Sequence, residues 1–218
     1  FRIDHYLGKE SVQNILTMKY SNNNFWSLMN NKNVSSIEFD LEEDEGVEKR
    51  IGYYNDAGAI KDMVQNHMLQ VLSLLLMEKP KKLISEEISM EKVKTLNKIN
   101  FINDKDNLIG QYKSYSKEAK LYGINNSKIE TYCKLHLECK NERWKGVKII
   151  IKTGKKLKKR FGRITINFNN KNYKIIIDLH PNQEIIFYKN SKVIKNIDFC
   201  KNCSFNPNTP DAYEVLLN

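Results

Sequence analysis

Residues 129–139 read Ile-Glu-Thr-Tyr-Cys-Lys-Leu-His-Leu-Glu-Cys, so that apolar or small side chains alternate with charged and polar ones. A period of two is what a β-strand with one buried face produces. Further segments predicted as strands follow in the second half of the chain, separated by short polar turns, at 147–152, 163–169, 173–179 and 184–188. A series of strands joined by short turns predicts an antiparallel sheet.

The first half of the chain carries a helical period instead. The clearest helix is predicted over 56–77, where apolar side chains recur every three or four positions. These positions are Ile60, Met63, Val64, Met68, Val71, Leu74 and Leu75. Asp56 is the predicted N-cap of this helix, and Pro80 marks its end. Shorter elements are predicted in three places, which are helices over 10–20 and 90–99 and a strand over 35–41.

Helices followed by a series of strands predict the α+β class, with the helices packed on one large, mostly antiparallel sheet. The 218 residues, of which 40% are hydrophobic, suffice for the core of such a domain. We expect a single domain over 1–218 with three stretches: a helix-rich part over 1–100, a surface loop over about 104–128, and a sheet-rich part over 129–190.

The net charge of +10 suits an anionic partner, which can be a nucleic acid, a phosphorylated metabolite or an acidic membrane surface. No apolar run reaches the roughly 18 residues of a membrane span, so that no membrane partner is expected. The chain begins at Phe1 without a charged leader, which predicts that it has no secretory signal and continues a longer chain. A cytoplasmic location is therefore expected.

The four cysteines do not predict a metal site. Cys200 and Cys203 have the C-x-x-C spacing of zinc ligands, but a structural zinc needs four ligands and no second pair has a suitable spacing. Cys133 and Cys139 are spaced to lie on one face of a strand, which is typical of core thiols.

The stretch with the most varied chemistry is 2–10, Arg-Ile-Asp-His-Tyr-Leu-Gly-Lys-Glu. Asp4, His5, Tyr6 and Lys9 supply an anion, a group that titrates near neutral pH, a phenol and a cation. A fold does not need this mixture within one turn of chain, whereas a site for a small anionic substrate does.

A second informative stretch, 52–70, reads Gly-Tyr-Tyr-Asn-Asp-Ala-Gly-Ala-Ile-Lys-Asp-Met-Val-Gln-Asn-His-Met-Leu-Gln. His67 falls on the apolar stripe of the predicted helix, one helical repeat after Ile60. By its spacing alone, such a histidine is more typical of a core residue than of a catalyst.

Both stretches resemble the signatures of glucose-6-phosphate dehydrogenases, in the order and at the separation found in that family. Further similar strings are Asn-Glu-Arg-Trp at 141–144, Thr-Gly-Lys at 153–155 and Pro-Asp-Ala-Tyr-Glu at 210–214. The resemblance implies NADP-dependent oxidation of D-glucose 6-phosphate at C1 to 6-phosphoglucono-1,5-lactone, the first step of the oxidative pentose phosphate pathway.

The resemblance also implies a role for each site residue. His67 is the general base and Asp4 is the carboxylate that holds it. The residues implied to bind the substrate are His5, Tyr6, Lys155 and Arg160 at the phosphate, Lys9 near the reacting carbon, Glu43 and Asp62 at sugar hydroxyls, and His180 at a place where the family often has glutamine.

The resemblance implies that NADP is bound mainly by a domain outside this chain, because no G-x-G-x-x-G turn and no Walker A loop occurs here. A second, structural NADP is not expected, since the matching places hold residues that cannot contact its phosphates, Glu42, Phe161, Thr165 and Asp178. The partners implied are glucose 6-phosphate and further copies of the chain, in a homodimer or tetramer formed through the sheet.

Two alternatives remain open at this point. The run Gly-Lys-Lys-Leu-Lys-Lys-Arg at 154–160 can belong to a basic module that binds RNA or DNA, although no aromatic residues are interleaved with it for base stacking. The chain can also be a degenerate homologue that serves assembly alone. The first alternative predicts steeply salt-dependent nucleic-acid binding and no effect of altering His67. The intact Asp4, His5, Lys9 and His67 argue against the second, since drift would be expected to remove some of them.

Overall fold

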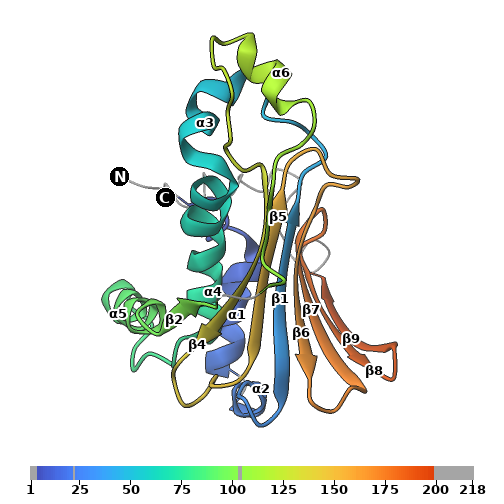
Figure 1. Cartoon of the computed structure of the whole chain (residues 1–218). Helices are drawn as coiled ribbons and strands as arrows, with labels where there is room; N and C mark the ends of the chain where they lie inside the picture. The colour runs from blue at the N-terminus through green and yellow to red at the C-terminus, as the bar shows by residue number, and fades with distance from the viewer. Residues whose placement is uncertain (1–3, 22, 103–104, 199–218) are drawn as a thin grey trace, which may run out of the picture.

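The computed structural model describes residues 4–21, 23–102 and 105–198, and it contains one broad sheet with helices packed against one face (Figure 1). The strand order is β2-β4-β5-β1-β6-β7-β8-β9, with β3 pairing with β4. Among the described pairs, β1 and β5 run parallel and the others antiparallel. The strands are β1 (Val34–Glu42), β2 (Ile99–Phe101), β3 (Leu108–Gly110), β4 (Tyr132–Cys139), β5 (Lys148–Gly154), β6 (Phe161–Phe168), β7 (Tyr173–His180), β8 (Glu184–Lys189) and β9 (Lys192–Asp198). The predicted α+β class with a mostly antiparallel sheet is therefore confirmed.

The helices are α1 (Glu10–Ser21), α2 (Asn23–Leu28), the 3₁₀ turn η1 (Glu48–Arg50), α3 (Ile51–Ala59), the π-helix η2 (Ile60–Met68), α4 (Leu69–Leu76), α5 (Ser85–Leu96) and α6 (Tyr115–Lys120). The core lies between the sheet and the α1, η2 and α4 layer. Ile37 and Phe39 of β1 and Leu72 of α4 are among its fully buried side chains. Cys133 and Cys139 are buried free thiols in this core, as predicted, whereas Cys200 and Cys203 lie outside the described residues.

The long helix predicted over 56–77 is divided into α3, η2 and α4. Asp56 is not its N-cap, because helical structure begins earlier and Asp56 lies inside α3. Gly58 interrupts the run with φ 64° and ψ 178°. Apolar periodicity shows which face of a segment is buried, but it does not reveal a break in the backbone, which explains the error.

The prediction of an irregular loop over 104–128 is wrong in part. That stretch contains β3 and α6, and α6 builds a second small core in which Tyr115 packs with Tyr54 and Ile51 of α3. Short elements in a polar context give weak periodic signals, which also explains why β2, β3 and β9 were not predicted. α6 also packs against the segment that follows β1, because Tyr115 and Ala119 share this small core with Val47. The segment predicted as a loop therefore helps to support the chain beside the site.

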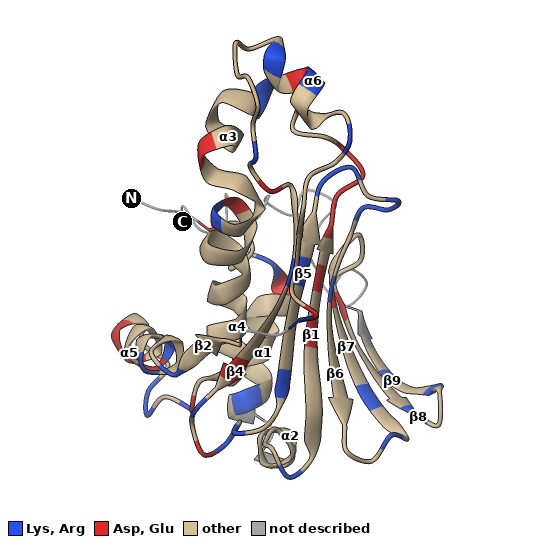
Figure 2. Ribbon diagram, viewed as in Figure 1, with Lys and Arg blue, Asp and Glu red and all other residues tan. Residues whose placement is uncertain are grey.

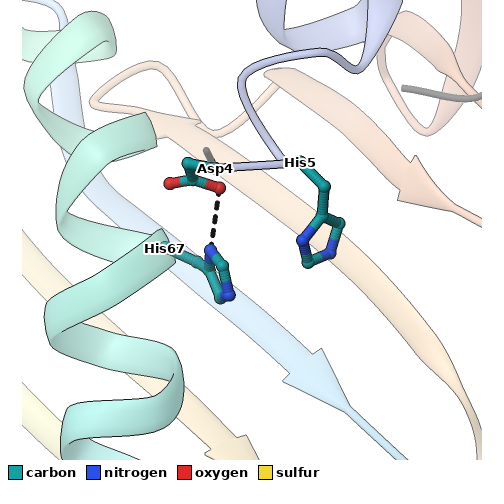
Figure 3. A group of neighbouring side chains, drawn as sticks. All are labelled: Asp4, His5 and His67. Carbon is teal, nitrogen blue, oxygen red and sulfur yellow. Dashed lines mark hydrogen bonds and ion pairs between the residues drawn. The ribbon is translucent and has the colours of Figure 1, made fainter. Parts of the chain in front are cut away.

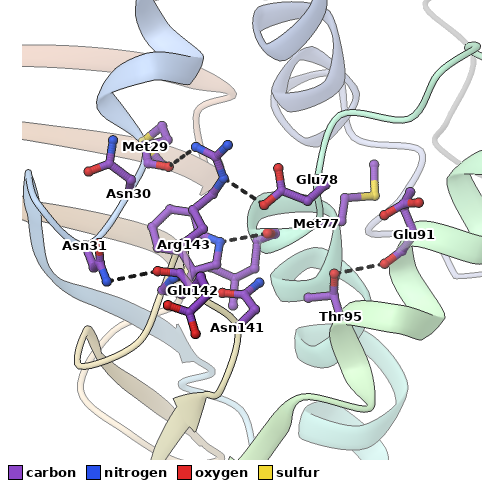
Figure 4. Close-up of polar contacts among 12 residues, drawn as sticks. Met29, Asn30, Asn31, Met77, Glu78, Glu91, Thr95, Asn141, Glu142 and Arg143 are labelled. Carbon is purple, nitrogen blue, oxygen red and sulfur yellow. Dashed lines mark hydrogen bonds and ion pairs between the residues drawn. The ribbon is translucent and has the colours of Figure 1, made fainter.

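Arg143, from the family-like string at 141–144, ties the sheet to the helices (Figure 4). Its Nε donates to Glu78 Oε1 at 2.8 Å and its Nη1 to the carbonyl of Met29 at 3.2 Å. The next residue, Trp144, is fully buried and its Nε1 donates to the carbonyl of Leu76 at 2.7 Å. This string therefore stabilises the end of α4 and the β4–β5 turn.

None of the helices within the described ranges is long and apolar enough to cross a lipid bilayer.

Replacing Gly58 by alanine is expected to lower the free energy of unfolding by about 1–3 kcal/mol, because its φ and ψ are open almost only to glycine. A Cβ at this position would also overlap the carboxylate of Glu130. Gly52→Ala is the matched control in the same helix, since a Cβ there meets no atom within 4 Å. Chemical denaturation of both variants measures the difference, and equal stability of the two would contradict the backbone break.

Candidate active site

A cavity of about 560 Å³ opens where the N-terminal segment, η2, the end of β1 and the β5–β6 loop meet. Its wall contains every predicted substrate residue and the predicted base. The lining residues are His5, Tyr6, Lys9, Leu41, Glu42, Glu43, Arg50, Tyr53, Asp62, Met63, Asn66, His67, Lys155, Arg160, Phe161, Gly162 and His180. Residues that lie far apart in the sequence thus face one space.

Asp4 does not line the cavity but contacts His67 behind its wall (Figure 3). Nδ1 of His67 lies 2.7 Å from Asp4 Oδ1, and both side chains are largely buried. The backbone N–H of Tyr6 also donates to Asp4 Oδ1, at 2.9 Å, which orients the carboxylate. A carboxylate accepts only, so Nδ1 carries the proton and Nε2 is left as the basic atom.

His67 lines the cavity, and its ring contacts several neighbours there. Nε2 of His67 lies 3.5 Å from Asn66 Nδ2, which is at the limit of hydrogen-bond distance. His67 also lies against two other rings of the site, with centroids 4.8 Å from His5 and 5.0 Å from Tyr6. The imidazole is therefore fixed by packing as well as by its carboxylate.

Tyr6 and Lys9 stand side by side on the turn before α1, with Lys9 Nζ 5.5 Å from the Tyr6 ring centroid. Burial raises the pKa of Tyr6 well above its usual value, and the carboxylate of Glu43 adds to the increase. The phenol is neutral at pH 7, as tyrosine ordinarily is, and it can donate a hydrogen bond to an anion.

Lys155 and Glu43 form an ion pair across the cavity wall. Nζ of Lys155 lies 2.7 Å from Glu43 Oε2, and the lysine side chain is only 7% exposed. The neighbouring Lys156, Lys158 and Lys159 are exposed, and Lys156 pairs with Glu118. Within this basic run, which Figure 2 shows in the loop between β5 and β6, Lys155 and Arg160 line the cavity.

Arg160 and His180 complete the side of the cavity formed by β6, β7 and the loop before them. Arg160 is half exposed, with Nη1 3.6 Å from Glu45 Oε1. Burial lowers the pKa of His180, and the cations of Arg160 and Lys9 lower it further. His180 is thus held neutral beside two cations, which is the electrostatic setting of an anion site.

The π-helix explains why Asp62 and His67 share the cavity. Residues five positions apart lie about 140° apart around an α-helix of 3.6 residues per turn. The wider turn of a π-helix, with i→i+5 hydrogen bonds, instead brings such residues closer to the same face. Asp62 and His67 both lie in η2, and both line the cavity.

The sequence analysis missed four polar lining residues, Glu42, Arg50, Tyr53 and Asn66. Nη2 of Arg50 lies 3.2 Å from Asp62 Oδ1, and its guanidinium lies 5.3 Å from the Tyr53 ring centroid. Tyr53 lies within the 52–70 stretch and Arg50 lies just before it. Their proximity to this family-like stretch was the one indication in the sequence that they could belong to the site. Without the η1–α3 geometry, nothing indicated that they face the same side as Asp62.

The described residues do not offer a good fit to a metal or to a second dinucleotide. Asp4, His5 and His67 have ligand atoms within 4.8 Å of one another, but Asp4 Oδ1 is already hydrogen-bonded to Nδ1 of His67 at 2.7 Å, and only the buried Asp4 Oδ2 is without a hydrogen-bond partner among the facing atoms of these two residues within the described part of the chain. On the open face of the sheet, Arg163 is paired with Asp178 through two hydrogen bonds, of 2.7 and 3.1 Å. That pairing leaves this arginine poorly placed to bind a phosphate.

The sequence and the fold match one known family. A sequence profile described as "Glucose-6-phosphate dehydrogenase, C-terminal domain" matches residues 16–218. The chain is 36% identical over 250 residues to a glucose-6-phosphate 1-dehydrogenase of Chlamydia trachomatis serovar D, with 100% of this chain and 57% of that protein covered. It is 44% identical over 168 residues to a protein of Solanum tuberosum named "Glucose-6-phosphate 1-dehydrogenase, cytoplasmic isoform", covering 77% of this chain and 32% of that protein.

Among solved structures, the chain is similar to one described as "Glucose-6-phosphate dehydrogenase in complex with its substrate glucose-6-phosphate". The TM-score is 0.86 at 33% sequence identity, and the match covers 100% of this chain and 50% of that one. The chain spans about half the length of the first curated relatives that it matches, 57%, 52% and 51% of them.

Proposed function

This chain belongs to the glucose-6-phosphate dehydrogenase family, and from that membership we propose that it forms the substrate-binding half of an enzyme that oxidises glucose 6-phosphate at C1 to the lactone. The observation that carries the proposal is the hydrogen bond of 2.7 Å between Asp4 and His67, at the wall of a cavity that also contains buried and exposed cations. A base and an anion site in one cavity are what this oxidation requires.

The proposed reaction begins at the C1 hydroxyl of the sugar. Nε2 of His67 accepts the hydroxyl proton, and Asp4 stabilises the imidazolium that forms while holding the ring in place. Lys9 contacts the substrate near C1 and stabilises negative charge as it develops on the oxygen. NADP, when bound, would supply the acceptor for the hydride from C1.

The other residues bind and orient the substrate. His5, Tyr6, Lys155 and Arg160 bind the phosphate, and the neutral phenol of Tyr6 donates a hydrogen bond to it. Glu43 and Asp62 accept hydrogen bonds from sugar hydroxyls, and His180 contacts the substrate beside Lys9. In this arrangement the Lys155–Glu43 pair joins the phosphate end to the hydroxyl end of the site.

Enzymes of this family use NADP in general. We place the main NADP site outside the 218 residues, because the sequence contains no glycine-rich dinucleotide turn. A structural NADP on the sheet is not proposed, since Asp178 is engaged by Arg163 and Phe161 is apolar.

We further propose a cytoplasmic homodimer or tetramer formed through the sheet. One face of the sheet carries the helices while the opposite face is open in the described part of the chain (Figure 1). The relative of Solanum tuberosum is named a cytoplasmic isoform, which supports the location. The nucleic-acid alternative is disfavoured because Lys155, the lysine that begins the basic run, is buried in the cavity wall.

Direct binding tests the substrate assignment on the chain itself. Isothermal titration is expected to show binding of glucose 6-phosphate and much weaker binding of free glucose. Lys155→Met keeps the buried stem but removes the cation, and it should raise the Kd for glucose 6-phosphate about 10- to 100-fold, the loss of one charge-assisted hydrogen bond.

Lys158→Met is the matched control, since Lys158 is an exposed lysine of the same run. Its Kd for glucose 6-phosphate should stay within about twofold of that of the unaltered chain, because a solvated charge contributes little. Equal weakening by both substitutions would point to general attraction by the basic run, and the assignment of Lys155 to the phosphate would then be wrong.

A further inference from the structure

The N–H groups that follow the backbone break at Gly58 are hydrogen-bonded by Glu130, which lies far away in the sequence. Glu130 stands just before β4, and its side-chain Oε1 accepts the backbone N–H of Ile60 at 3.0 Å. Its backbone carbonyl accepts the N–H of Ala59 at 2.9 Å. The same carboxylate occupies the space that a Cβ on residue 58 would need.

These contacts lie at the first residues of η2. Positive φ at Gly58 ends the hydrogen bonding of α3, so that the N–H groups that follow need acceptors from elsewhere. Glu130 supplies acceptors to two consecutive N–H groups, those of Ala59 and Ile60. It also places a carboxylate at the amino end of a helix, where negative charge is favoured. Glu130 therefore caps the amino end of η2 from another segment, while Ala59 is the N-cap residue of the helix itself.

η2 is also the element that carries Asp62 and His67. Ile60 is held by Glu130, and Asp62 is the next residue but one. The position and rotation of the first turn of η2 decide where the later side chains of this helix point. Glu130 is not among the cavity-lining residues, so any influence on the reaction must pass through the helix.

We propose that Glu130 is a positioning residue of the dehydrogenase: by capping η2 at Ile60, it holds Asp62 and His67 on one face, directed into the cavity. This inference rests on the proposed function. What Glu130 contributes is an oxygen acceptor at a fixed distance, since the Ile60 N–H can bond to an amide oxygen as well as to a carboxylate. The length of the side chain matters more than its charge.

Three substitutions in the complete enzyme test the proposal, with kcat expressed per folded molecule. Glu130→Ala removes the acceptor and should lower kcat about 10-fold or more, as expected for a misplaced base. Glu130→Gln keeps the length and the oxygen and should retain kcat within about threefold. Glu130→Asp keeps the charge but withdraws the acceptor by one methylene, and it should lose more activity than Glu130→Gln.

Glu138→Ala is the matched control, because Glu138 lies in β4 and makes only a partly exposed ion pair with Lys140, at 3.3 Å. Its kcat should be unchanged. A merely structural role for Glu130 would lower the melting temperature of Glu130→Ala but leave kcat per folded molecule at the normal value, and that result would overturn the proposal. If Glu130→Ala does not fold, greater loss in Glu130→Gln than in Glu130→Asp would overturn it instead.

His67→Ala in the same assay separates this inference from the proposed function. Normal turnover of His67→Ala would remove the basis of both. Loss of turnover in His67→Ala together with normal turnover in Glu130→Ala would leave the proposed function standing and refute the role of Glu130 alone.

Discussion

His67→Ala in the complete enzyme is expected to lower kcat about 10²- to 10⁴-fold, the usual contribution of a general base. KM for glucose 6-phosphate should change little, because the proposed phosphate and hydroxyl contacts come from other residues of the cavity. Alanine leaves the C1 hydroxyl without an acceptor for its proton in the step in which the hydride leaves. The proton must then go to water, which is a much weaker base.

Steady-state kinetics with varied glucose 6-phosphate at saturating NADP measures this effect. His136→Ala is the control, since His136 is a half-buried histidine of β4 outside the cavity. It should leave kcat unchanged within about twofold, as expected for a substitution away from the site. Ordinary turnover by His67→Ala would refute the proposed function and revive the reading of the chain as an assembly module.

Asp4→Asn has the second-largest expected effect on the reaction. The amide keeps the size of the side chain but loses the charge, so it stabilises the imidazolium of His67 less, and it can present NH₂ to Nδ1. We expect kcat to fall about 10²-fold or more, as for loss of acid–base assistance, with KM nearly unchanged. The Oδ1 atom of Asp4 that bonds to His67 also accepts the Tyr6 N–H, so part of the loss comes from disorder of the turn.

Asp56→Asn serves as the control for Asp4→Asn, because Asp56 is an exposed carboxylate of α3 that does not line the cavity. The same kinetic assay applies, and a normal kcat is expected. An Asp4→Asn enzyme with normal kcat and a raised KM would contradict the proposed pairing, since it would mean that Asp4 binds the substrate and does not act through His67.

Much of the sheet could be predicted from the sequence, because in a strand with one buried face apolar and polar residues alternate. The strands predicted over 35–41 and 173–179 correspond to β1 and β7 within one residue at each end. The errors occur where the local sequence pattern does not indicate the backbone conformation. A glycine inside an apolar period gave no sign of its positive φ, and the short α6 was masked by polar neighbours.

The candidate site divides in a similar way. His67 was recognised as more than a core histidine only through the family-like string around it, because its position on the apolar stripe suited either role. The structure then brought all ten predicted site residues to one cavity or, for Asp4, to the base at its wall. Whether these residues have the proposed roles is what the kinetic and binding predictions test.

The amino-acid sequence by itself determined which chemistry is available and which face of each element is apolar, since both are properties of residues close together in the chain. The tertiary structure alone decided which distant groups meet. Asp4 and His67 are 63 positions apart, Glu43 and Lys155 are 112 apart, and Glu130 caps a helix that begins 70 positions earlier. Such contacts depend on how the helices pack on the sheet and on the break in the backbone at Gly58. Neither can be predicted from the periodicity of nearby residues, because that periodicity reports only which face of an element is apolar.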